Sequence, residues 1–163
     1  MLLRWPFCHW VHWISFGGGV GLIPFAPGTW GSLWGVLLAV VVGHHFWLLY
    51  IATIVAILLS LFAIPITSKA LNVHDHSSIV IDEVAGQLMT YCMAFECLSY
   101  MGFFFYVCGF ILFRCFDIFK IGWAKYCDQQ QSAVSVTLDD LCAGLYAAGV
   151  TIILSYAIHF WYL

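Results

Sequence analysis

The charged residues of this chain are confined to two short segments, and the stretches outside them are almost free of charge. Eleven of the thirteen Asp, Glu, Lys and Arg residues lie within residues 69–83 and 114–140. The stretches 5–68, 97–113 and 141–163 contain none. In the hydrocarbon of a bilayer, ionisable groups are retained only where they perform a task. The distribution therefore predicts an integral membrane protein whose function resides in the two charged segments.

Composition supports this class and excludes several others. The chain is 64% hydrophobic and 8% charged, whereas soluble domains are about 25% charged, and we predict one membrane domain over residues 1–163. A net charge of −3 without a basic stripe argues against nucleic acid as a partner, and no protein partner is indicated. Neither the seven cysteines nor the seven histidines show the C-x-x-C or H-E-x-x-H spacing of zinc, redox or disulfide sites.

The apolar runs predict an all-α fold, a polytopic bundle of about four to five membrane-embedded helices arranged as hairpins. One hairpin tip is expected at residues 43–45, where Gly and His interrupt the run. A second is expected at Glu96, because one helix over residues 84–113 would be about 45 Å long and would overshoot a hydrocarbon layer of about 30 Å. The expected helices cover residues 33–42, 46–66, 80–95, 98–119 and 138–160.

Two further segments have their own predictions. Residues 17–32 are rich in Gly and Pro, so we expect an irregular loop that enters the first helix with Thr29 or Ser32 as N-cap. The N-terminal segment is expected to be retained and to lie in the membrane interface, since it is aromatic. Small residues in the last helix predict close packing against a neighbouring helix; they are Ala143, Gly144, Ala147, Ala148 and Gly149.

These elements place three polar regions, 17–32, 67–83 and 114–140, on one face of the membrane. Both hairpin tips and the C-terminus are then expected on the other face. Four of the five Lys and Arg residues belong to the first face, so the positive-inside rule makes that face cytoplasmic.

Six carboxylates from three separate segments are predicted to meet at this face. They are Asp75, Asp82, Glu83, Asp117, Asp139 and Asp140. Such a group would repel itself unless a cation binds among its members, and oxygen ligands of this kind suit Mg²⁺. Arg114 and Lys120 could then hold a phosphate group. The alternative is that single acids form ion pairs or cap helices, but two or three basic residues cannot neutralise six acids.

Several of these positions also have local interpretations. Asp139 and Asp140 are expected to open the last helix, where the helix dipole favours negative charge. Asp82 and Glu83 lie one helical turn before Gly86 and Gln87, and a glycine there lets a neighbouring helix or a ligand come close. Two histidines flank Asp75 and could orient it or bind substrate, or could be solvated loop residues; they are His74 and His76.

Four ordered motifs resemble the phosphatidylglycerophosphatase A family. They are F-A-P-G-T-W-G-S (25–32), V-H-D-H-S-S-I-V-I-D-E-V-A-G-Q (73–87), F-R-C-F-D-I-F-K (113–120) and L-D-D-L-C-A-G (138–144). The resemblance covers nearly the whole chain. It implies an all-helical, Mg²⁺-dependent phosphatase of the bacterial inner membrane that converts phosphatidylglycerophosphate in the bilayer to phosphatidylglycerol and phosphate.

The acids and bases of the chain fall on the acidic and basic motif positions of that family, and we infer from their chemistry which of them bind the metal. Metal coordination is expected from Asp75, Asp82, Glu83, Asp139 and Asp140. Catalysis is expected from Asp82, Asp117, Lys120 and Asp140. Substrate binding is expected from Thr29, His74, His76, Arg114 and Lys120. The attacking group is either a metal-bound water or a carboxylate that forms an aspartyl-phosphate.

The chain departs from the family pattern at two places. After Lys120 the family usually has a K-P-x-P stretch, whereas this chain reads Lys120-Ile121-Gly122-Trp123. Residues 132–135 replace a Gly-rich run. The acidic and basic side chains are intact, and we expect retained activity. A small cation or proton transporter is the alternative, since ion pathways also need intramembrane acids; the acids here cluster at helix ends. A transferase that uses CDP-activated lipids would carry a D-x-x-D-G-x-x-A-R signature, which is absent.

Overall fold

The computed structural model describes residues 9–73, 76–130 and 132–161, and within these ranges every regular element is a helix. The all-α prediction is therefore confirmed. The α-helices are α1 (Trp10–Ser15), α2 (Pro27–Val42), α3 (Phe46–Leu71), α4 (Ile81–Met93), α5 (Leu98–Met101), α6 (Phe103–Phe119), α7 (Trp123–Asp128) and α8 (Ala133–Trp161). Two 3₁₀ turns, η2 (Gly17–Leu22) and η3 (Phe95–Cys97), join them.

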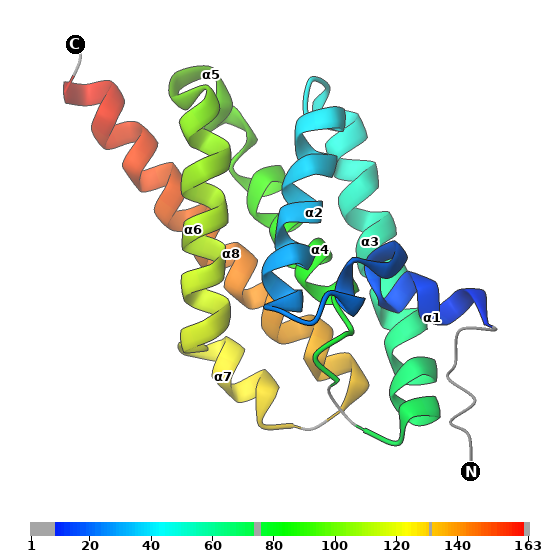
Figure 1. Cartoon of the computed structure of the whole chain (residues 1–163). Coiled ribbons are helices and arrows are strands. Elements are labelled where there is room, and N and C mark those ends of the chain that lie inside the picture. The colour runs from blue at the N-terminus through cyan, green and yellow to red at the C-terminus, as the bar shows by residue number, and fades with distance from the viewer. Residues whose placement is uncertain (1–8, 74–75, 131, 162–163) are drawn as a thin grey trace.

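Helix α4 lies at the centre, and α2, α3, α6 and α8 pack around it (Figure 1). Its side chains Leu88 and Tyr91 are almost completely buried in the core. Both predicted hairpins are present: α2 and α3 are joined by a short turn, and α4 leads through η3 and α5 into α6. Figure 1 shows the two hairpin tips and the end of α8 at one end of the molecule, and α7 with the start of α8 at the other.

Helix α2 begins earlier than predicted. It starts at Pro27, in the first turn, where the missing N–H and fixed φ of proline are favourable. The residue before it, Ala26, adopts a left-handed conformation with φ 49°. Thr29 and Ser32 therefore lie inside the helix, and the prediction that one of them is the N-cap is wrong. The Ser32 hydroxyl instead donates to the Gly28 carbonyl oxygen at 2.9 Å.

Helix α8 also begins earlier than predicted, at Ala133. Ser132 and Ser135 bond reciprocally, each backbone N–H donating to the other's hydroxyl oxygen at 3.0 Å. This is the geometry of a capping box with serine in place of the usual Glu or Gln. Asp139 and Asp140 consequently lie in the second turn, and the prediction that they open the helix is wrong.

Helices α4 and α8 cross with their backbones in contact. A Cβ added to Gly144 would lie 2.4 Å from the Gly86 carbonyl oxygen, so neither glycine tolerates a side chain at this crossing. Ala143, Ala147 and Ala148 on the same helix are buried. The predicted close approach of the last helix is thus confirmed, and it brings the start of α4 beside the second turn of α8.

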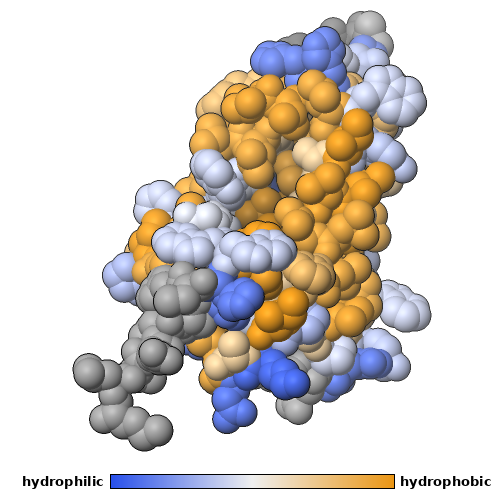
Figure 2. Space-filling view, turned by 90° about the vertical axis from the view of Figure 1, so that its right-hand side faces the viewer, coloured by the Kyte–Doolittle hydropathy of each residue, from blue (hydrophilic) through white to orange (hydrophobic). Residues whose placement is uncertain are grey.

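Two of the described helices, α3 and α8, are long and apolar enough to cross a membrane. Helix α4, with 13 residues, is too short to cross a hydrocarbon layer of about 30 Å. Figure 2 shows a broad apolar surface between more polar ends. The exposed large side chains of α3 include Trp47, Ile51, Val55, Leu58 and Phe62. The larger number of spans stays a prediction.

Helix α1 is fastened to the end of α3 by buried hydrogen bonds. The Thr67 hydroxyl lies 2.9 Å from His12 Nδ1 and 2.7 Å from the Ser15 hydroxyl. Burial lowers the pKa of the His12 ring, so its neutral form is favoured in this contact. Residues 1–8 lie outside the described part of the chain, and the interfacial placement of the N-terminal segment stays a prediction.

Candidate active site

A cavity of about 310 Å³ opens where the predicted polar regions meet. Its walls come from the loop before α2 and the first turn of that helix, from the segment before α4 and the first turn of α4, from the end of α6 and from the beginning of α8. The lining residues are Ala26, Pro27, Gly28, Thr29, Ser77, Ile79, Asp82, Glu83, Arg114, Asp117, Lys120, Val136, Asp139 and Asp140. Residues that are more than a hundred positions apart in the sequence, such as Pro27 and Asp140, therefore line the same cavity.

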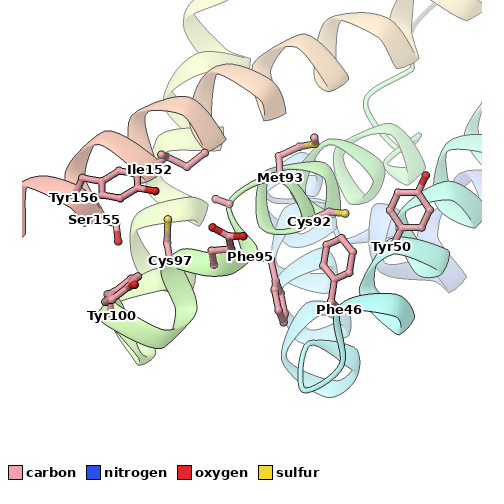
Figure 3. A pocket seen from close by; sticks show the side chains of 12 residues that line it. Phe46, Tyr50, Cys92, Met93, Phe95, Cys97, Tyr100, Ile152, Ser155 and Tyr156 are labelled. Carbon is pink, nitrogen blue, oxygen red and sulfur yellow. The ribbon is translucent and has the colours of Figure 1, made fainter. Parts of the chain in front are cut away.

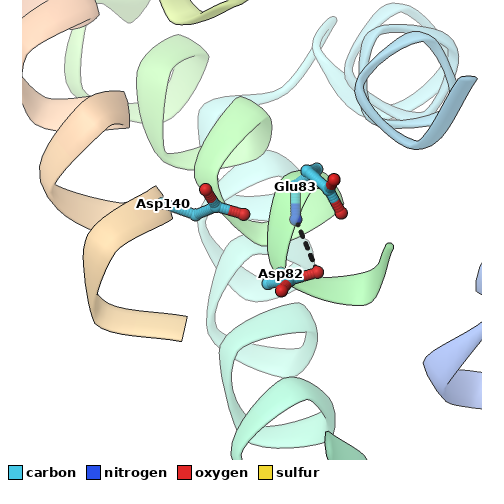
Figure 4. A group of neighbouring side chains, drawn as sticks. All are labelled: Asp82, Glu83 and Asp140. Atoms are coloured by element: carbon cyan, nitrogen blue, oxygen red, sulfur yellow. Dashed lines mark hydrogen bonds between the residues drawn. The ribbon is translucent and has the colours of Figure 1, made fainter. Parts of the chain in front are cut away.

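Three carboxylates form a cluster in this cavity (Figure 4). One oxygen from each of Asp82, Glu83 and Asp140 can be chosen so that all three lie within 4.8 Å of one another. Asp82 and Asp140 are only 4% and 5% exposed. Asp82 Oδ1 accepts a hydrogen bond from the Glu83 N–H at 3.1 Å, which orients the first carboxylate at the start of α4.

The cluster has the properties of a divalent cation site. Glu83 Oε2 is buried and has no hydrogen-bond partner among the described residues. Burial raises the pKa of the Glu83 carboxyl well above its usual value, and the Asp140 carboxylate raises it further. A bound cation would remove this penalty by compensating the charges. Ligands that are all carboxylate oxygens fit Mg²⁺ better than softer metals.

Two basic side chains face the same cavity, and each is held by an acid. Arg114 Nη1 donates to Asp117 Oδ2 in an ion pair and to the Ser32 hydroxyl at 3.3 Å. Lys120 Nζ lies 2.7 Å from Asp139 Oδ2. Asp117 and Asp139 therefore contact a basic group, and they are not members of the three-acid cluster.

The charges of the cavity do not balance. Five carboxylates and two basic groups line it, which leaves a formal excess of three negative charges. The ion pairs account for the two bases and for Asp117 and Asp139. A cation bound among Asp82, Glu83 and Asp140 would reduce this excess of negative charge.

Of the remaining predicted site residues that the structure describes, one lines the cavity and one does not. Thr29 lines the cavity in the first turn of α2. His76 is not among the lining residues, and its Nδ1 accepts a hydrogen bond from the Ser78 N–H at 3.2 Å. His74 and Asp75 lie outside the described residues, so their assignments stay predictions.

Sequence reasoning missed the importance of Gly28. A Cβ at this position would lie 2.4 Å from Glu83 Oε1 and 3.3 Å from Arg114 Nη1. The first turn of α2 thus forms a wall directly against the charged groups, and only glycine allows this approach. The signal was the Pro27-Gly28 pair, in which proline marks the first turn of a helix.

A larger cavity of about 560 Å³ lies at the hairpin-tip end of the molecule (Figure 3). Aromatic and apolar side chains dominate its walls, including Phe46, Tyr50, Tyr100 and Tyr156. Glu96 is the one acid among the described residues that line it, and no basic residue is among them. Hydrolysis of a phosphate ester needs charge-stabilising groups, so the smaller, charged cavity is the better candidate.

An all-helical protein with clustered acids facing an arginine and a lysine carries the groups that phosphoryl-transfer enzymes use. The sequence model of one family, described as phosphatidylglycerophosphatase A, matches residues 13–155. The chain belongs to the phosphatidylglycerophosphatase A family, and the resemblance of its four motifs is confirmed. Members of this family are phosphomonoester hydrolases.

Two relatives show the extent of the similarity. A Haemophilus influenzae protein named phosphatidylglycerophosphatase A is 35% identical over 158 residues, which cover 94% of this chain and 91% of that protein. An Escherichia coli protein of the same name is 32% identical over 141 residues, covering 85% of this chain and 80% of that protein. No solved structure shows significant similarity to the chain. The transporter alternative finds no support among these relatives.

Proposed function

We propose that this protein hydrolyses the terminal phosphomonoester of phosphatidylglycerophosphate to phosphatidylglycerol and phosphate, with Mg²⁺ as cofactor. One observation carries the proposal: the cluster of Asp82, Glu83 and Asp140 lies in the same cavity as Arg114 and Lys120. The family and the named relatives supply the substrate. The three clustered acids would hold Mg²⁺, which supplies charge neutralisation and activates water when bound.

The other charged side chains of the cavity bind the phosphate, position the basic groups and transfer protons. Arg114 and Lys120 bind the phosphate oxygens and offset the charge that spreads over them during transfer. Asp117 and Asp139 keep these two bases in place through their ion pairs. As the water oxygen bonds to phosphorus, the bond from phosphorus to the glycerol oxygen breaks. Asp117 accepts a proton from the attacking water and later releases it to the solvent, and the leaving glycerol oxygen takes a proton from a solvent water to become a hydroxyl.

We propose further that the protein is a multi-pass protein of the bacterial inner membrane with four to five embedded helices and the charged cavity facing the cytoplasm. The apolar surfaces of α3 and α8 support embedding. The polar residues of the cavity lie at helix ends, where a headgroup can reach them while the acyl chains remain in lipid. Asp75, His74 and His76 are proposed as additional ligands of the metal or the headgroup.

Phosphate release from short-chain phosphatidylglycerophosphate by the purified protein tests the function. We expect release with Mg²⁺ and none with a chelator. Asp82→Asn and Asp140→Asn should each lower kcat by at least about 100-fold, the scale for loss of one preorganised charged or polar group. Glu96→Gln, at the other end of the molecule, is the control and should retain full activity. Release that persists in the chelator, or that is unchanged in both Asp variants, would contradict the proposal.

A further inference from the structure

Gln87 is a buried amide that the proposed mechanism does not use. The residue has no exposed surface, and neither its Nε2 nor its Oε1 has a hydrogen-bond partner among the described residues. Its buried polar neighbours on α4 are satisfied: the Thr90 hydroxyl bonds to the Gly86 and Gly144 carbonyl oxygens, and the Tyr91 hydroxyl donates to the Tyr106 carbonyl oxygen. A buried, unpaired amide is unusual enough in a native protein to require an explanation.

Its position connects it to the acidic cluster. Gln87 lies four residues after Glu83 on α4, so the two side chains share one face and are about 6 Å apart along the helix axis. Both face α2. A Cβ added to Gly35 would lie 2.9 Å from Gln87 Cβ, and one added to Gly28 would lie 2.4 Å from Glu83 Oε1.

Two other buried polar atoms close to the part of α2 between Gly28 and Gly35 have no hydrogen-bond partner among the described residues. They are Glu83 Oε2 and Arg114 Nε. Arg114 Nη1 donates a hydrogen bond to the Ser32 hydroxyl, and Ser32 lies between Gly28 and Gly35 on α2. The set contains an acceptor at Glu83, a donor at Arg114 and an amide that can serve as either.

We propose that Gln87 is a positioning residue of the metal site, linked to Glu83 Oε2 through one buried water. This water donates to Glu83 Oε2 and accepts from Gln87 Nε2 and Arg114 Nε, and three bonds of this kind are typical of a buried water. The link holds the Glu83 carboxylate so that its other oxygen faces Asp82 and Asp140. The inference rests on the proposed role of Glu83 as a metal ligand.

A purely structural role makes a different prediction. If Gln87 only fills space, an apolar side chain of similar shape should fill it as well and should leave metal binding unchanged. If Gln87 orients Glu83, the same replacement should weaken metal binding, because residues that orient a ligand commonly contribute about 10- to 100-fold to metal affinity.

The experiment measures Mn²⁺ affinity of the full-length protein in detergent by electron paramagnetic resonance, with thermal melting in chelator as a second readout. Gln87→Met should lower Mn²⁺ affinity about 10- to 100-fold while its melting temperature without metal stays equal or rises. Tyr91→Phe is the matched control, since it removes a buried polar group one turn further along the same face. Its Mn²⁺ affinity should equal that of the unchanged protein.

Mn²⁺ affinity of Gln87→Met within twofold of the unchanged protein would overturn the inference. Gln87→Ala serves as a second variant with the same expected loss of affinity. Failure of both variants to fold would also overturn it, because an amide bonded only to one water is dispensable for folding. If the unchanged protein binds no Mn²⁺, the proposed metal site itself is wrong. If the unchanged protein and the variants bind Mn²⁺ equally well, only the role of Gln87 is wrong.

Discussion

At the scale of single residues, the five described acids of the cavity fall into two groups. Asp82, Glu83 and Asp140 approach one another, whereas Asp117 and Asp139 each hold a basic side chain. The sequence predicted that acids and bases would meet, but it assigned Asp139 to the metal. In the structure Asp139 contacts Lys120, and its assignment as a metal ligand stays a prediction.

Arg114→Lys tests the contribution of the guanidinium. Arg114 contacts both Asp117 and Ser32 through one nitrogen, and lysine lacks the planar fork that also binds a phosphate. We expect kcat/KM for phosphatidylglycerophosphate to fall about 10- to 100-fold, the equivalent of one charge-assisted hydrogen bond of roughly 1.5–3 kcal/mol. Steady-state phosphate release measures this effect.

Lys125→Arg is the control for this substitution, because Lys125 is exposed on α7 and does not line the cavity. It should leave kcat/KM unchanged. Equal activity of Arg114→Lys and Lys125→Arg would show that Arg114 does not bind the phosphate.

At the scale of elements, the long helices and their hairpin pairing could be predicted, but the starts of α2 and α8, the short helix α7 and the break at Gly102 that divides the predicted helix 98–119 into α5 and α6 could not. Apolar runs separated by His44 and by Glu96 were sufficient for the pairing, since a lipid-facing helix needs an uninterrupted apolar surface. The start of α2 was missed because Pro and Gly suggested a loop, although proline is favourable in a first helical turn. The start of α8 depends on the reciprocal bonds between Ser132 and Ser135, for which the usual capping sequence is absent.

Small residues in α8 indicated that another helix packs closely against it, but the sequence did not show that this helix is α4. A run such as Ala143-Gly144 shows that some helix approaches closely. Only the three-dimensional arrangement identifies Gly86 as the contact. This contact brings Asp140 to Asp82 and Glu83, so the geometry of the metal site depends on two glycines that have no chemistry of their own.

Gly144→Ala should therefore affect both stability and function. The added methyl group would overlap the Gly86 carbonyl oxygen at 2.4 Å, and overpacking of this kind costs about 1–3 kcal/mol. Thermal melting in detergent should show a lower melting temperature, and Mn²⁺ titration should show weaker binding because α8 is displaced from α4.

Gly149→Ala is the matched control on the same helix. No atom lies within 4 Å of a Cβ added at Gly149, and alanine in a helix is favoured over glycine by about 0.5–1 kcal/mol. Its melting temperature should be unchanged or slightly higher. A Gly144→Ala protein that melts and binds Mn²⁺ like Gly149→Ala would contradict the proposed role of the crossing.

At the scale of the whole molecule, the surface is apolar between two more polar ends (Figure 2). The charged cavity belongs to the end with α7 and the start of α8, and the aromatic cavity belongs to the other end. If α3 crosses the membrane, the exposed side chains near its middle face lipid, whereas they would face water in a soluble protein.

Leu58→Lys distinguishes these environments. Leu58 lies near the middle of α3 and is 59% exposed. A lysine at the centre of a transmembrane helix costs about 2.5–3.5 kcal/mol on insertion scales, whereas a surface substitution in a soluble protein changes stability by about 0.5 kcal/mol or less. The yield of membrane-inserted protein should fall clearly.

Trp47→Lys, in the first turn of the same helix and 71% exposed, should be tolerated better. A lysine near a helix end can extend its amine to the interface. Equal insertion of both variants would argue against α3 as a membrane-spanning helix.

The central claim is that Asp82, Glu83 and Asp140 hold the metal of a lipid phosphatase. The most direct measurement is the anomalous difference density of Mn²⁺ in crystals of the protein. We predict a single strong peak between these three carboxylates, in the cavity that Arg114 and Lys120 also line. A peak elsewhere, or no peak in crystals of protein that releases phosphate with Mn²⁺, would contradict the account.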